Sequence, residues 1–440
     1  MIRLNPALCV FLILSAFLGA CSGTWREGRT ERSSGYEKEI VQDGGSAAAW
    51  DAPLAARESR YALLRGCAAE LAAAMDDRFL AAQVIMAGLD GKDRLSQVMQ
   101  DIYRAVPPGA IMLFRYNLDS EKALVRALLA ECSAFVAEAG MNGIYPFMAV
   151  DHEGGEVHRF GPGVERLPSA ASYGEIARKQ GSGEALLLVE ADARRSGQEI
   201  RALGITMNLA PVAEFLTPEN KAFLAERSYG SSGSFTQDAA AAFIRGMAAS
   251  GVACVVKHFP GNSSGDPHRE RISLSLDRES LDLLAGPFAG LIKAPASQNC
   301  RPAGIMISHS IAAARDPLRN ASLSPLIIRD WLRGELGFEG IALGDDFSMP
   351  AIALSGMGTE EAVVAALEAG IDMVMVWPRD IVSVHKAIVS ALDSGALSRE
   401  RLREAVTRIL CEKLRFGLVR GEGPSAVSIS LSLEGNRVFN

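Results

Sequence analysis

The side chains best suited to chemistry gather where an apolar run stops. The segment VVKHFPG at residues 255–261 ends such a run in Lys257 and His258, and GDPH follows at residues 265–268. Cationic and imidazole groups are costly in an apolar core without partners, which favours a polar site at the end of a strand. Asp266 and His268 are two residues apart, so the carboxylate could orient an imidazole that exchanges protons near neutral pH. We predict this dyad as a general acid/base, with a surface turn as the alternative reading.

Polar residues also follow other apolar runs. They are Asp151, Glu214, Ser308 with His309, Asp345 with Asp346, and Trp377. In a barrel of parallel strands, the carboxyl ends of the strands converge on one mouth, where active sites are built. We therefore expect these residues to meet in space.

Eight short apolar runs alternate with helical patterns and indicate the fold class. Continuous apolar strands mean that both faces of the sheet are covered, which favours a parallel sheet, and eight repeats favour closure. We predict an α/β fold, a (β/α)8 TIM-type barrel forming a single catalytic domain, with an open doubly wound sheet as the alternative. The runs are 82–89, 110–114, 147–150, 205–209, 252–256, 304–307, 340–343 and 371–376. Helices are expected, among others, at 54–75, 186–203, 237–250, 326–336, 360–369 and 399–416.

Composition excludes several functional classes. The chain has 440 residues, 48% of them hydrophobic and 22% charged, which suits one large barrel and argues against disorder. A net charge of -7 without long basic runs gives no electrostatic footprint for nucleic acid. Of the seven cysteines, those after residue 21 are odd in number and scattered, which is not a disulfide framework. No CxxC or HExxH spacing supports a metal site, and we expect neither metal nor cofactor.

The N-terminus has the pattern of an export signal. Arg3 precedes an apolar run, residues 7–20, which is shorter than a membrane-spanning helix requires. The run ends in LGAC, which resembles a bacterial lipobox in which Cys21 is acylated; an ordinary signal peptide is the alternative. We divide the chain into a signal peptide (1–20), a lipidated cysteine with flexible linker (21–55), a barrel domain (56–420) and a C-terminal tail (421–440). The expected location is the cell envelope, with a lipid anchor in the membrane.

Five motifs, in order, carry a resemblance to a known family. Besides KHFPG with its nearby Asp-x-His, the chain contains AVDHEGGEVHRF at 149–160, LAPV at 209–212, ERSYG at 226–230 and LGDDFSM at 343–349. Together they resemble glycoside hydrolase family 3, in particular its β-N-acetylglucosaminidase branch, in which a loop histidine replaces the usual catalytic carboxylic acid. Only about two dozen residues follow the last predicted helix. Many two-domain relatives supply their acid/base from a second domain, so this ending supports the loop-histidine branch.

The resemblance implies a role for each matching residue. Asp345 corresponds to the nucleophile and His268 to the acid/base, with Asp266 as its partner. Residues that would grip the terminal sugar are Asp151, Arg159, Arg227, Lys257 and His258. Without the other motifs, Asp345-Asp346 reads as a capping pair before a helix, and either arginine as a surface ion pair. His309 either lines the mouth or satisfies a buried carbonyl.

Some positions depart from the family pattern. Asn262-Ser263-Ser264 stand where the family has His-Gly, and the loop to His268 is shorter than usual. Glu214 stands where an Asp is common, and Gly344 replaces a Ser. These changes keep every catalytic group but bear on substrate preference and on the reach of the loop.

The resemblance implies a retaining exo-β-N-acetylglucosaminidase that acts as a monomer on cell-wall fragments or related glycans. A β-glucosidase or an N-acetylglucosaminide phosphorylase would use the same residues. A lipoprotein that binds sugar or protein without catalysis is the alternative from a different class.

Overall fold

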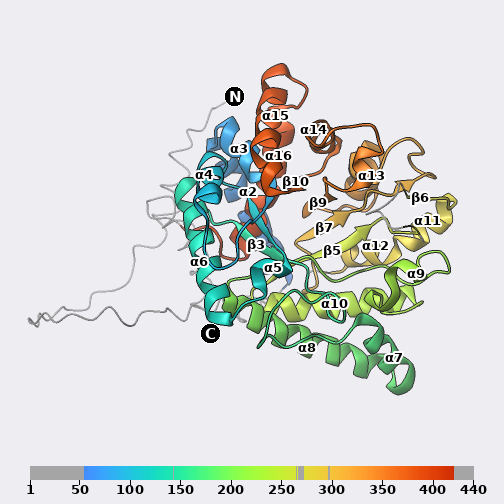
Figure 1. Ribbon diagram of the computed structural model, residues 1–440. Helices are drawn as coiled ribbons and strands as arrows, with labels where there is room; N and C mark the ends of the chain where they lie inside the picture. Colours follow the sequence, from blue (N-terminus) through green and yellow to red (C-terminus); the bar gives the residue numbers. More distant parts are fainter. Residues whose placement is uncertain (1–53, 142, 264, 266–271, 296–297, 421–440) are drawn as a thin grey trace, which may run out of the picture. The chain divides into compact units, whose positions relative to one another are not determined.

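Eight parallel strands close into a barrel at the centre of the described chain (Figure 1). The computed structural model describes residues 54–141, 143–263, 265, 272–295 and 298–420, all within the unit Gly44–Asn440. The strands follow each other around the barrel as β1-β10-β9-β7-β5-β4-β3-β2, and β1 pairs with both β2 and β10. Their bounds are β1 Ile85–Gly88, β2 Ala110–Leu113, β3 Phe147–Val150, β4 Met207–Asn208, β5 Ala253–Phe259, β7 Gly304–Ile307, β9 Ile341–Asp346 and β10 Met373–Val376.

The predicted barrel is confirmed, and the open doubly wound sheet is wrong. Each of the eight apolar runs overlaps one barrel strand, and β1, β2, β3 and β10 are buried along their whole length. Burial of both faces explains why these strands read as continuous apolar runs. The predicted strand ends need correction. β5 continues through Lys257 and His258 and β9 through Asp345 and Asp346, so these four residues lie within strands and not just after them.

Helices surround the barrel, and they include every helix named from the sequence. The first and last described helices, α2 and α16, pack together, as do α8 and α10 (Figure 1). Residues 326–335, expected as an ordinary helix, wind as a π-helix. The helices are α2 Leu54–Ala74, α3 Asp77–Gln83, α4 Gln97–Ala105, α5 Arg115–Leu118, α6 Lys122–Ala139, α7 Ala170–Gln180, α8 Ser182–Leu203, α9 Lys221–Leu224, η2 Ala225–Arg227, α10 Gly233–Ala249, α11 Arg278–Leu284, α12 Gly286–Lys293, η4 Ala321–Leu323, η5 Leu326–Glu335, α13 Pro350–Ala353, α14 Thr359–Ala369, η6 Pro378–Asp380, α15 Ile381–Ser394 and α16 Arg399–Arg415. Two short strands outside the barrel, β6 Ser273–Leu274 and β8 Ile311–Ala312, pair in parallel.

Capping residues fix where the helices begin and end. Ser398 accepts a hydrogen bond from the Arg401 N–H and begins α16. Gly370, in the left-handed region at φ 119°, ends α14. Such caps set the short turns that lead from helix to strand.

Two barrel strands carry an extra residue where polar side chains occur. Between Val256 and Phe259, β5 advances three residues while β7 advances two, from Ile305 to Ile307. Between Leu343 and Asp346, β9 likewise advances three residues against two on β10. Such bulges re-aim side chains and are common next to active sites. They fall at Lys257-His258 and at Gly344-Asp345.

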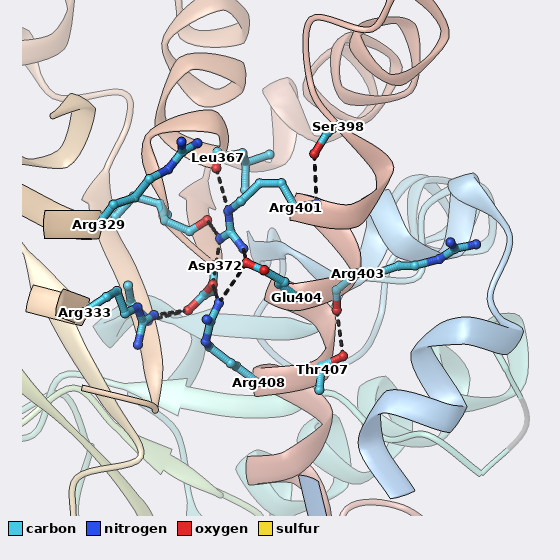
Figure 2. A network of polar contacts seen from close by, with 12 residues as sticks. Arg329, Arg333, Leu367, Asp372, Ser398, Arg401, Arg403, Glu404, Thr407 and Arg408 are labelled. Atoms are coloured by element: carbon cyan, nitrogen blue, oxygen red, sulfur yellow. Dashed lines mark hydrogen bonds and ion pairs between the residues drawn. The ribbon is translucent and has the colours of Figure 1, made fainter. Parts of the chain in front are cut away.

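An arginine cluster joins η5 and α16 to the start of β10 (Figure 2). The carboxylate of Asp372, fully buried, accepts hydrogen bonds from the guanidinium groups of Arg333, Arg401 and Arg408 and from the Ala342 N–H. Burial by itself raises the pKa of Asp372, but the three cations outweigh it and lower the pKa. This end of the barrel is therefore held together by a buried carboxylate.

Lys413 is buried on α16 without an opposite charge. Its Nζ donates to Gln83 Oε1 at 2.7 Å, and no described acidic residue forms an ion pair with it. Burial lowers its pKa from 10.5 to about 7. Between these pH values the unfolded chain binds the proton and the folded chain does not. The lysine therefore destabilises the fold increasingly as pH falls from 10.5 to about 7, and to a constant extent below that.

Lys413→Met is expected to remove this pH dependence. The free energy of unfolding of the variant relative to the wild type should rise by up to about 1.4 kcal/mol per pH unit on going from about pH 9 to about pH 7. Urea unfolding across this range measures the difference, and Lys386→Met, at an exposed lysine, is the matched control. Parallel pH profiles for the wild type and Lys413→Met would contradict the assignment.

Several predicted features lie outside the described residues: Cys21 with its signal, the linker up to residue 53, the dyad of Asp266 and His268, and the tail 421–440. The last two residues of the predicted linker, Leu54 and Ala55, begin helix α2. Within the described chain, no helix combines the length and the apolar character needed to cross a membrane. Cys67, Cys132, Cys254, Cys300 and Cys411 are free thiols.

Candidate active site

The carboxyl ends of β3, β5 and β9 bring polar side chains from distant parts of the chain to one mouth of the barrel. Asp151 follows β3, Lys257 and His258 lie on β5, and Asp345 lies on β9. Lys257 contacts Asp151 directly, and both Lys257 and His258 lie close enough to Asp345 to lower its pKa. The predicted convergence at the strand ends is therefore observed for these four residues.

Two carboxylates and two cations form a buried cluster beside β5. Lys257 Nζ lies 2.5 Å from Asp151 Oδ1 and 2.7 Å from Glu153 Oε1. Arg227, at the end of η2, donates from Nε and Nη2 to the two oxygens of Glu153 at 2.8 and 2.9 Å. The side chains of Lys257 and Glu153 are 4% and 5% exposed, so neither charge is shielded by bulk water. Mutual pairing is what makes this burial tolerable.

The pairing fixes the charge state of the cluster. Burial by itself raises the pKa of Glu153, but Lys257 and Arg227 outweigh it and lower that pKa strongly. Burial lowers the pKa of Lys257, but the two carboxylates more than compensate and raise it. Glu153, Lys257 and Arg227 are thus charged near neutral pH. The side chains of the cluster are preorganised donors and acceptors of the kind that form hydrogen bonds with sugar hydroxyls.

Glu214 holds His258 in place. One oxygen, Oε1, lies 2.7 Å from His258 Nδ1 and 3.2 Å from the His258 backbone N. Asn262 donates to the same carboxylate from its backbone N, at 2.7 Å, and from Nδ2, at 3.0 Å. Because an ionised carboxylate only accepts hydrogen bonds, the contact places a proton on Nδ1 of the imidazole. Nε2 has no partner among the described residues, which leaves it available at the mouth.

Asp345 has one carboxylate oxygen fixed and one open. The backbone N–H of Asp346 donates to Oδ1 at 2.8 Å, whereas no described residue donates to Oδ2. Burial by itself raises the pKa of Asp345, but His258, His309, the Asp346 N–H and Lys257 together lower it. An ionised carboxylate with one free oxygen in a cationic pocket has the properties of a nucleophile.

Both carboxylate oxygens of Asp346 accept hydrogen bonds from neighbouring residues. Its Oδ1 accepts from the backbone N and Oγ of Ser348, and its Oδ2 accepts from Trp377 Nε1. Asp346 also lines a cavity of about 360 Å³ with Ser348, Met349, Pro350, Trp377 and Arg379. Of the two neighbouring aspartates, only Asp345 therefore has an oxygen free of described donors.

Of the two roles considered for His309, the structure shows the second: it satisfies a buried carbonyl. It is 1% exposed, and its Nε2 lies 3.0 Å from the backbone carbonyl oxygen of Asp346. A carbonyl only accepts, so Nε2 carries a proton, and Nδ1 lies 2.7 Å from Ser322 Oγ. The imidazole thus satisfies a buried carbonyl behind the nucleophile.

The two arginines predicted to bind sugar differ in their surroundings. Arg227 is paired with Glu153 in a buried setting, so the surface ion pair considered from the sequence is wrong for it. Arg159 is half-buried after β3 and forms no ion pair with any described residue. Burial lowers the pKa of the nearby His152 imidazole, and His158 and the Arg159 guanidinium lower it further. Arg159 therefore retains hydrogen-bonding capacity near His152, the residue that follows Asp151.

The loop that contains Asp266 and His268 is flanked by segments placed near the mouth. It leaves the carboxyl end of β5 after Phe259, and Ile272, just beyond it, accepts a hydrogen bond from Ile311 at 2.8 Å. The next residues form β6, which pairs with β8 just after barrel strand β7. Both flanks thus lie on the side of the barrel where Asp345 is found.

Two important carboxylates received no role from the sequence. Glu153 binds both Lys257 and Arg227, and Glu214 fixes His258. The available signals were their positions. Glu153 lies two residues after Asp151 in a glycine-rich loop, and Glu214 lies shortly after the fourth barrel strand. A carboxylate between two cations distant in sequence cannot be recognised before the fold brings them together.

The chain is similar to known proteins over most of its length. A β-hexosaminidase of Methylococcus capsulatus is 32% identical over 299 residues, which cover 66% of this chain and 82% of that protein. A β-hexosaminidase of Stenotrophomonas maltophilia is 31% identical over 322 residues, which cover 71% and 90%. The solved structure of a glycoside hydrolase family 3 β-N-acetylglucosaminidase from Paenibacillus sp. is similar with a TM-score of 0.72 and 31% identity, over 80% of this chain and 64% of that one. Residues 80–411 match the glycosyl hydrolase family 3 N-terminal domain, and the chain belongs to this family.

Proposed function

We propose that this glycoside hydrolase is a retaining exo-β-N-acetylglucosaminidase that removes terminal β-linked N-acetylglucosamine from cell-wall fragments or related glycans. The observation that carries the proposal is Asp345 Oδ2, to which no described residue donates, near the cluster of Lys257, Asp151, Glu153 and Arg227. The two relatives named β-hexosaminidases and the Paenibacillus β-N-acetylglucosaminidase favour the N-acetyl sugar. We propose that the reaction requires no metal or cofactor.

The first half-reaction forms a covalent intermediate. Oδ2 of Asp345 bonds to the anomeric carbon as the bond from that carbon to the leaving oxygen breaks. The leaving oxygen takes a proton from the imidazolium of His268, which Asp266 stabilises. Lys257 and His258 lie close enough to favour the ionised form of Asp345 before attack. The site therefore needs the carboxylate charged and the histidine protonated at the start.

The second half-reaction returns the enzyme to its initial state. The neutral imidazole of His268 takes a proton from water, and the water oxygen bonds to the anomeric carbon as the bond to Asp345 breaks. Two displacements at one carbon retain the β configuration. Phosphate in place of water would give a sugar 1-phosphate from the same intermediate.

The terminal sugar is bound by groups that the cluster keeps oriented. Arg227 uses Nε and Nη2 on Glu153, so Nη1 remains for a hydroxyl. Lys257 uses two of its three N–H groups on carboxylates, and Asp151 has a second oxygen to accept from the sugar. Arg159 and His258 Nε2 complete the proposed set.

Substrate preference tests the proposal. We expect kcat/KM for 4-nitrophenyl β-N-acetylglucosaminide to exceed that for the corresponding β-glucoside by at least about 10²-fold, because a site that hydrogen-bonds an amide discriminates strongly against its absence. Equal rates on the two sugars would contradict the N-acetyl preference. Parallel reactions with phosphate, assayed for a sugar 1-phosphate, distinguish hydrolysis from phosphorolysis. Recovery of intact glycan after prolonged incubation would instead favour a binding protein.

We further propose that the protein is exported and anchored to the cell envelope as a monomer through a lipid on Cys21. A flexible linker would hold the barrel away from the membrane surface and near peptidoglycan. In the full-length protein, Cys21→Ser is expected to move the enzyme from the detergent phase to the aqueous phase on detergent partitioning. Unchanged partitioning of this variant would contradict lipidation at that residue.

A further inference from the structure

The hydrogen bond from Asp346 to the nucleophile depends on a peptide group that is held from two sides. The Asp346 N–H donates to Asp345 Oδ1 at 2.8 Å, and no described residue donates to Oδ2. The Asp346 carbonyl accepts from His309 Nε2 at 3.0 Å, and the following N–H, that of Phe347, donates to the Met375 carbonyl on β10 at 3.2 Å. The main chain next to the nucleophile is thus linked to the segments after β7 and on β10.

The side chain of Asp346 supplies the remaining restraint, and Trp377 is its anchor on the neighbouring strand. Trp377 follows β10 directly, and its Nε1 donates to Asp346 Oδ2 at 2.8 Å. The indole stacks on Phe114, at the end of β2, with ring centroids 4.6 Å apart and planes 7° apart. Stacking fixes the direction of the N–H, since the ring cannot turn without losing this contact. The other oxygen of Asp346 is occupied by Ser348.

We propose that Trp377 is a positioning residue for the nucleophile. It holds the Asp346 carboxylate, and through it the peptide N–H that orients Asp345 and favours its ionised form. The inference rests on the proposed role of Asp345, but it concerns a residue of β10 that does not touch Asp345. The bulge leaves Gly344 and Asp345 without regular partners on β10, so the contact of Trp377 adds a link between β9 and β10 at this point.

Trp377→Phe separates the hydrogen bond from the stacking. Phenylalanine keeps an aromatic ring beside Phe114 but has no N–H for Asp346. We expect kcat on the N-acetylglucosaminide to fall about 10- to 100-fold with KM changed less than about threefold, because a small misplacement of a reacting group costs this much. Trp331→Phe, the same change at a buried tryptophan on η5 that packs against Phe259, is the matched control and should leave kcat within about twofold.

A direct contact of Trp377 with the sugar predicts a different pattern. Trp377 lines the cavity beside Asp346, so a role in binding would raise KM and leave kcat nearly unchanged, which would overturn the proposal. A double-mutant cycle with Asp346→Asn provides a second criterion. If Trp377 acts through Asp346, the two losses in kcat will be far from additive, whereas additive losses would contradict the proposal.

The pKa of Asp345 gives a readout that does not depend on turnover. The Asp346 N–H contributes to lowering that pKa, so Trp377→Phe should raise it. A carbon-13 titration of the Asp345 carboxylate measures the shift, and in an active enzyme the acidic limb of kcat/KM should move to higher pH in parallel. An unchanged Asp345 pKa would overturn the positioning role. Absence of turnover in the wild type would instead contradict the proposed function and leave this titration valid.

Discussion

Replacing Asp345 with alanine is expected to lower kcat on the N-acetylglucosaminide by about 10³-fold or more, because the covalent route loses its nucleophile. Initial rates with saturating substrate measure the effect. The variant should remain folded, since the removed carboxylate receives one described hydrogen bond and its loss leaves no buried charge without other partners. Asp330→Ala, at an exposed aspartate on η5, is the matched control and should keep wild-type activity.

Azide distinguishes loss of the nucleophile from general damage to the site. In Asp345→Ala it can occupy the space of the missing carboxylate and attack the anomeric carbon directly. This single displacement should restore turnover and give a glycosyl azide of inverted configuration. A variant that retains more than about a tenth of the wild-type kcat without azide would contradict the assignment.

Removing Asp372 is expected to have the largest effect on stability. Asp372→Ala leaves the guanidinium groups of Arg333, Arg401 and Arg408 without their shared acceptor (Figure 2). Breaking a buried ion pair from one side costs roughly 3–5 kcal/mol. Urea unfolding should show this loss in the free energy of unfolding. The kcat of the folded variant should stay near the wild-type value, because the cluster lies at the start of β10 and the nucleophile at the end of β9.

A nearby exposed pair provides the control for Asp372. Glu368 binds Arg329 at 2.9 Å, and the two side chains are 47% and 45% exposed. Glu368→Ala should therefore change the free energy of unfolding by no more than about 1 kcal/mol. A comparable loss in both variants, or a loss below about 1 kcal/mol for Asp372→Ala, would show that burial of the cluster does not determine its contribution.

The barrel could be predicted because strands that are buried on both faces of the sheet appear in the sequence as continuous apolar runs. The runs at 110–114, 147–150 and 304–307 are almost entirely apolar, and each contains a strand bounded to within one residue. Strand ends were less predictable at the two bulges. There the apolar pattern stops at Val256 and Leu343, yet pairing continues to Phe259 and Asp346. A polar residue within a bulged strand is therefore predicted as part of a loop.

The site could be predicted only in part, because motifs identify residues and not the contacts between them. Asp151, Lys257, His258 and Asp345 were expected to converge, and they do. The function of Glu153 became apparent only from its position between Lys257 and Arg227, residues separated from it by long stretches of chain. Trp377 was noted as a polar residue after a strand, but its contact with Asp346 depends on the twist of β10 against β9.

Trapping the glycosyl-enzyme tests the central claim most directly. A 5-fluoro N-acetylglucosaminyl donor slows both half-reactions, so the intermediate should accumulate and add the mass of one sugar to the intact protein. Peptide mapping with fragmentation then assigns the attached residue within the segment 344–349. The account predicts one label, on Asp345 and not on Asp346. A label on any other residue, or turnover of the donor with no covalent adduct, would contradict it.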